Sequence, residues 1–93
     1  MELNREMMEE LKQLSTLSAQ LKDAENLWGE QCTARWTAVE RGAGQDVVQK
    51  HSEQIINTVN RIAYIKNMIV EHVHLLAAQY NAIPSTESQE VQP

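Results

Sequence analysis

The sequence predicts an all-α protein built as an antiparallel helical hairpin of two long helices. Two observations predict it: each half of the chain carries an apolar stripe, and a single glycine-containing loop separates the halves. Apolar residues at alternating steps of four and three keep one face of a helix against a partner helix. Only Ser52 and Lys66 interrupt the stripe of the second half, whose members are Val48, Ile55, Val59, Ile62, Ile69, Val73, Leu76, Tyr80 and Ile83.

The first helix is predicted over residues 4–41. Asn4 is a residue type that caps helix N-termini, and Glu6 follows in the first turn, where negative charge is favourable. Gly42 is a typical C-terminal stop. The apolar stripe of this helix consists of Leu3, Met7, Leu11, Leu14, Leu21, Trp28, Cys32, Trp36 and Val39.

The second helix is predicted over residues 46–83, after a loop at 42–45. Asp46 and Gln49 have the spacing of a capping box at the start of this helix. Pro84 lacks a backbone N–H and therefore ends it.

Folding the chain at this loop fixes how the two stripes face each other. Positions whose numbers sum to roughly 87 become neighbours in an antiparallel hairpin of this kind. Because apolar residues then face apolar residues along the whole length, the two stripes support each other, and the hairpin should be ~55 Å long. The predicted pairs are Val39 with Val48, Cys32 with Ile55, Trp28 with Val59, Leu14 with Val73, Leu11 with Leu76, and Met7 with Tyr80.

Length and composition set the size and class of the protein. Ninety-three residues suffice for one small domain, which we place at 1–84, followed by a polar tail at 85–93 that is predicted to be disordered. Aromatic residues make up 4% of the chain and Phe is absent, which suits thin helical seams better than a thick core. The net charge is −5 without a basic cluster, so nucleic-acid binding is not expected.

A second apolar row lies beside the stripe of the second helix and repeats every seven residues. The apolar face is therefore wider than one partner helix requires. We expect a homodimer or a heteromeric complex to complete a four-helix bundle by helix–helix packing. The predicted partner-binding residues are Ile56, Ala63, Ile65, Met68, Val70 and Ala77.

Lys66, within the stripe, has two explanations. It could fix the register of the helices by pairing with Glu25. Alternatively, its aliphatic stem crosses the apolar surface while the ammonium group extends into water, which we favour.

Other polar patterns do not predict a catalytic or metal site. Glu71 and His74 have the spacing of carboxylate-bridged di-iron ligands, but with Val73 on the stripe both should face solvent. The three histidines should be isolated from one another, and Cys32 between two tryptophans is typical of a core position rather than of a nucleophile. No Gly-rich phosphate loop is present. We predict no metal site, no cofactor and no enzymatic activity.

Cys32 is the only cysteine, which indicates a reducing compartment and excludes a disulfide within one chain. The chain has no apolar leader region and no window approaching the ~20 apolar residues of a membrane span. Its polar helix faces are acidic or neutral, which disfavours membrane-surface binding. We expect a soluble cytoplasmic protein, although export without a cleaved signal would leave the same pattern.

The turn at Arg41–Gly44 and the helical run from Gln54 to Tyr64 resemble the short helical-hairpin co-chaperones of type III secretion systems, over about half of the chain. Such proteins hold an aggregation-prone needle or filament subunit in the cytoplasm. The resemblance implies a secretion co-chaperone that covers helical surfaces of a self-assembling client. Two alternatives stay open: a small acidic dimeric regulator that sequesters a transcription factor or an enzyme, and a structural subunit of a helical assembly.

Overall fold

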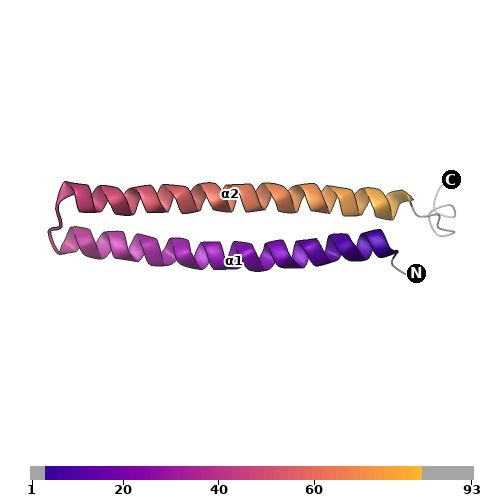
Figure 1. Ribbon diagram of the computed structural model, residues 1–93, viewed down its shortest axis with the longest axis horizontal. Coiled ribbons are helices and arrows are strands. Elements are labelled where there is room, and N and C mark those ends of the chain that lie inside the picture. Colours follow the sequence, from indigo (N-terminus) through magenta and orange to yellow (C-terminus); the bar gives the residue numbers. More distant parts are fainter. Residues whose placement is uncertain (1–3, 83–93) are drawn as a thin grey trace, which may run out of the picture.

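A computed structural model describes residues 4–82 of the protein. Helix α1 (Arg5–Glu40) and helix α2 (Gln45–Ala82) lie side by side and antiparallel, joined by a short loop at one end (Figure 1). Their 36 and 38 residues correspond to a length of about 55 Å each. The predicted all-α hairpin is confirmed, and residues 4–82 contain no strand. The expectations for Leu3 and for residues 83–93 lie outside the described residues.

The N-terminus of α1 is capped as predicted. The Asn4 side-chain oxygen accepts a hydrogen bond from the Met7 backbone N–H at 2.7 Å. Glu6 lies in the first turn, where its carboxylate faces the positive end of the helix dipole. The hydrogen bond from Met7 to Asn4 satisfies one of the backbone donors that the first turn of a helix leaves free.

The C-terminus of α1 ends in a Schellman motif around Gly42. The Gly42 N–H donates to the Val39 carbonyl at 3.1 Å, and the Ala43 N–H donates to the Ala38 carbonyl at 3.0 Å. Gly42 has a φ of 75°, a backbone conformation that glycine adopts without the steric penalty of a side chain. The glycine therefore reverses the chain and satisfies carbonyls of the last helical turn.

The cap of α2 lies two residues before the predicted capping box. The Gly44 carbonyl accepts hydrogen bonds from the N–H groups of Val47 and Val48, both at 3.1 Å, so Gly44 occupies the cap position. Asp46 lies inside the first turn instead. Its carboxylate there still interacts favourably with the helix dipole.

The two helices meet along a contact surface that we call the seam. On α2, one predicted row of the seam is present and is at least half-buried: Val48, Ile55, Ile62, Ile69 and Leu76. The second row is not the predicted one. It consists of residues one position earlier in each repeat: His51, Thr58, Ile65, His72 and Gln79.

The residues predicted for that second row instead lie outside the seam. Val59, Val73 and Tyr80 are 44, 46 and 57% exposed, and Lys66 is exposed as well. The α2 helix is therefore rotated about its axis relative to the prediction, toward a more polar contact with α1.

Helix α1 shows the same rotation. Leu11, Trp28, Trp36 and Val39 were predicted in the stripe, but all four are exposed. The α1 side of the seam follows regular three- and four-residue steps, and its buried or half-buried members are Met7, Glu10, Leu14, Leu17, Leu21, Ala24, Gln31, Arg35 and Ala38. Trp28 falls on the same steps but is 44% exposed.

The core of the hairpin is thin. Within the described residues, the buried apolar side chains are those of Met7, Ala24 and Ile65, and Thr58 is the buried polar residue. A two-helix contact covers only one stripe of each helix, so most large apolar side chains keep part of their surface exposed.

Polar contacts link the helices near both ends. Toward the loop, the Arg35 Nε–H donates to Ser52 Oγ at 2.9 Å. Toward the open end, His72 Nδ1 lies 2.5 Å from Glu10 Oε2, with both side chains mostly buried. These contacts compensate for polar groups that the seam would otherwise bury without partners.

Within the described residues, neither helix has a stretch that is both apolar enough and long enough to cross a lipid bilayer.

Candidate partner-binding face

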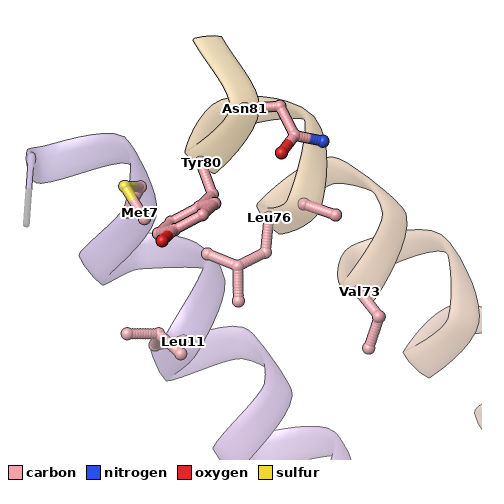
Figure 2. Close-up of a pocket in the computed structure, with 7 residues that line it drawn as sticks. Met7, Leu11, Val73, Leu76, Tyr80 and Asn81 are labelled. Atoms are coloured by element: carbon pink, nitrogen blue, oxygen red, sulfur yellow. The ribbon is translucent and has the colours of Figure 1, made fainter. Parts of the chain in front are cut away.

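One flank of the seam carries two open apolar grooves. The first has a volume of about 360 Å³ and lies toward the open end of the hairpin. Figure 2 shows Leu76 and Tyr80 reaching from α2 toward α1, beside Met7 and Leu11. Val73, Ala77 and Asn81 complete its lining. Met7 and Tyr80, and likewise Leu11 and Leu76, are pairs that the predicted register brings together.

The second groove, of about 420 Å³, lies toward the loop. Its lining comes from both helices and consists of Cys32, Arg35, Trp36, Ser52, Ile55 and Ile56. Cys32 and Ile55 are also a predicted pair. The predicted register along the hairpin is therefore correct at both ends, although the rotation of each helix about its own axis is not.

Both grooves belong to a continuous surface that we call the open face. It contains the two rows of residues that lie beside the seam on this flank of each helix, and nearly all of them are exposed. On α1 the open face comprises Met8, Leu11, Ser15, Ser18, Lys22, Glu25, Gly29, Cys32, Trp36 and Val39; on α2 it comprises Gln49, Ser52, Ile56, Val59, Ala63, Lys66, Val70, Val73, Ala77 and Tyr80.

The apolar and polar residues of the open face are distributed unevenly. Large apolar side chains lie toward both ends of α1, with Trp36 62% exposed near the loop. The middle of the face is charged instead: Lys22, Glu25 and Lys66 are all exposed there. The structure records no ion pair between Glu25 and Lys66, and Lys66 lies outside the seam, so neither predicted explanation of a lysine within the seam applies.

Four of the six predicted partner-binding residues lie on the open face. Ile56 and Val70 are exposed, and so are Ala63 and Ala77. Because these residues repeat every seven positions, they form one row along α2. The hairpin does not use this row for its own packing.

The other two predicted residues lie elsewhere. Ile65 is only 3% exposed, because the rotation of α2 places it in the seam against α1. Met68 is half-buried and lies on the flank opposite the open face. That flank also exposes Leu27, Val47 and Leu75, separated by polar residues.

His51, His72 and Cys32 are half-buried, and His74 is exposed. Glu71 and His74 are exposed, as predicted, and no group of three potential ligands within residues 4–82 could hold a metal ion. The contact of His72 with Glu10 was missed, because the predicted stripe placed His72 outside the seam. Cys32 is half-buried at the edge of the second groove.

Comparisons with protein-family models, with curated proteins and with solved structures found no match for this chain.

Proposed function

We propose that the protein is a non-enzymatic protein–protein interaction module that packs its open face against helices of another protein. Within this class we favour a secretion co-chaperone that covers the helical surfaces of a self-assembling client. The proposed site of action is the cytoplasm, because the single Cys32 suits a reducing compartment.

The exposed apolar row on α2 is the observation that carries this proposal. Ile56 and Val70 are 56 and 51% exposed on a hairpin whose own core is thin. An amphipathic helix binds such a surface by placing apolar side chains into it at helical spacing. Subunits that polymerise through helical surfaces need those surfaces covered before assembly, and the open face provides a matching contact.

The charge of the protein favours a client with basic residues beside its apolar stripe. The chain has a net charge of −5, and the exposed Glu6 and Glu9 lie near the open end of the hairpin. Complementary charges raise association rates and discriminate against partners of like charge.

Affinity purification from the native cells, with matched variants, tests the proposal. Val70→Glu places a charge on the open face, whereas Leu75→Glu places it on the opposite flank at a similar exposure of 49%. A stoichiometric partner is then purified separately and remixed. We expect wild type and Leu75→Glu to bind it equally, and Val70→Glu to bind at least about tenfold more weakly, because burying an unpaired charge is unfavourable.

Circular dichroism of each variant provides the control for folding. The proposal is wrong if Val70→Glu binds like the wild type, or if Leu75→Glu alone disrupts the complex.

A further inference from the structure

We infer that, without another partner, two copies of the protein pack open face to open face as an antiparallel four-helix bundle. In this dimer α1 lies on α1 of the second copy, and α2 lies on α2. This inference rests on the proposed function, because both use the open face as the binding surface. It adds that the occupant of this face is a second copy of the chain.

The angular position of the open face indicates a hairpin rather than a single helix as the occupant. The open face lies roughly a quarter turn around each helix from the seam, given 3.6 residues per turn. In a square four-helix bundle each helix contacts two neighbours about a quarter turn apart. A single helix lying over the seam would leave the outer row, including Ile56 and Val70, largely uncovered.

The order of residues along α1 makes the face self-complementary. A twofold axis through the middle of the face places α1 of the second copy antiparallel on α1 of the first. Apolar residues then meet apolar residues: Met8 of one copy faces Val39 of the other, and Leu11 faces Trp36. At the middle, Lys22 of each copy faces Glu25 of the other copy. None of these six side chains is part of the hairpin's own core, since each is exposed.

Helix α2 fits the same twofold arrangement of the two copies. Val59 faces Val70, and Ile56 faces Val73, each from one copy to the other. Lys66 faces the small Ala63, which leaves room for its side chain to reach water. The middle of the α2 face lies within about one residue of the middle of the α1 face in the hairpin register, or roughly 1.5 Å along the axis.

The opposite orientation, with the two loops at the same end, brings like charges together. There α1 would lie on α2 of the second copy, and Lys22 would face Lys66. Because both ammonium groups are exposed at the middle of the face, this orientation places like charges directly opposite each other. Charge therefore favours the antiparallel dimer.

Thiol crosslinking of the purified full chain tests the geometry. In the inferred dimer, Cys32 faces Ser15 of the second copy, while the two Cys32 residues lie about 25 Å apart, or 17 residues along the helix. Disulfides need Cα atoms within about 7 Å. We expect mild oxidation to give covalent dimers of Ser15→Cys. Wild type should give none, and neither should Gln13→Cys, which places a thiol at a similar height on the opposite flank.

A charge exchange tests the middle of the interface. Lys22→Glu should raise the dimer dissociation constant about five- to tenfold, because it replaces two symmetric ion pairs with repulsion. The double variant Lys22→Glu, Glu25→Lys should have the dissociation constant of the wild type again. A wild-type protein that is monomeric, or a dimer in which Ser15→Cys does not crosslink, would overturn the inference.

The outcomes separate this inference from the proposed function. If the wild-type protein is a monomer and Val70→Glu abolishes its binding to a client, the inferred dimer is wrong and the proposed interaction module stands. If the protein forms the crosslinked dimer, and no client binds to this dimer or dissociates it, the inference is correct and the proposed function is wrong.

Discussion

Two glycines with opposite structural roles give opposite predictions for the same substitution. Gly29 lies within α1, and a β-carbon there would have nothing within 4 Å, so Gly29→Ala should raise the free energy of unfolding by about 0.5–1 kcal/mol. Gly42 has a φ of 75°, so Gly42→Ala should lower it by about 1–2 kcal/mol.

Thermal unfolding followed by circular dichroism at one protein concentration measures both changes. The account of the turn is wrong if Gly42→Ala is neutral. A destabilising Gly29→Ala would instead mean that another backbone approaches the helix at this position.

The contact between His72 and Glu10 should couple the two helices energetically. Their side chains are 19 and 17% exposed, so the contact is partly shielded from water. In a double-mutant cycle of Glu10→Ala and His72→Ala, we expect a coupling free energy of about 0.5–1.5 kcal/mol near pH 6. Urea unfolding of the four proteins measures it.

Glu9 provides the matched control for this cycle, because it is the exposed neighbour of Glu10. Glu9→Ala and His72→Ala should be additive. A coupling as large as that of Glu10 would show that general charge, rather than the direct contact, is responsible.

At the scale of the helices, polar residues limit the stability of the seam. The side-chain oxygen of Gln31 is buried, and no donor from residues 4–82 forms a hydrogen bond with it; the same holds for Gln79. Gln31→Leu should therefore raise the free energy of unfolding by about 1–2 kcal/mol. Gln13→Leu, at an exposed position, should change it little.

Chemical denaturation compares the two leucine variants with the wild type. If Gln31→Leu destabilises the protein, the Gln31 side chain has a required polar partner, and the assignment of this position to the seam must be revised.

The sequence predicted the two helices, the Asn4 cap and the register of the hairpin. Each of these depends on local signals: a capping side chain, the Gly42 stop and the spacing of apolar residues. The register follows because the loop is short and both stripes start from it. These features required no knowledge of other contacts.

The rotation of each helix could not be predicted from the same pattern. The apolar face of α2 is wide enough for two contacts. The sequence shows which residues are apolar, but it does not show which of them belong to the contact with α1 and which to a second contact. The most apolar rows were assigned to the seam, whereas the hairpin buries a row with His72 and Gln79 and leaves Val59 and Val73 exposed. Ile65 was assigned to the partner surface for the same reason.

At the scale of the whole molecule, the hairpin is thin. It is only 14 Å across in its thinnest direction, and the described residues bury few apolar side chains. Packing on the open face would therefore supply the core that the hairpin lacks.

The most direct test of this account is the mass of the purified full chain in sedimentation equilibrium, measured with Val70→Glu and Leu75→Glu alongside. If the open face is a packing surface that a second copy occupies, wild type and Leu75→Glu sediment at twice the chain mass of 10.6 kDa, and Val70→Glu at the chain mass. Three stable monomers, or three dimers of equal affinity, would contradict it.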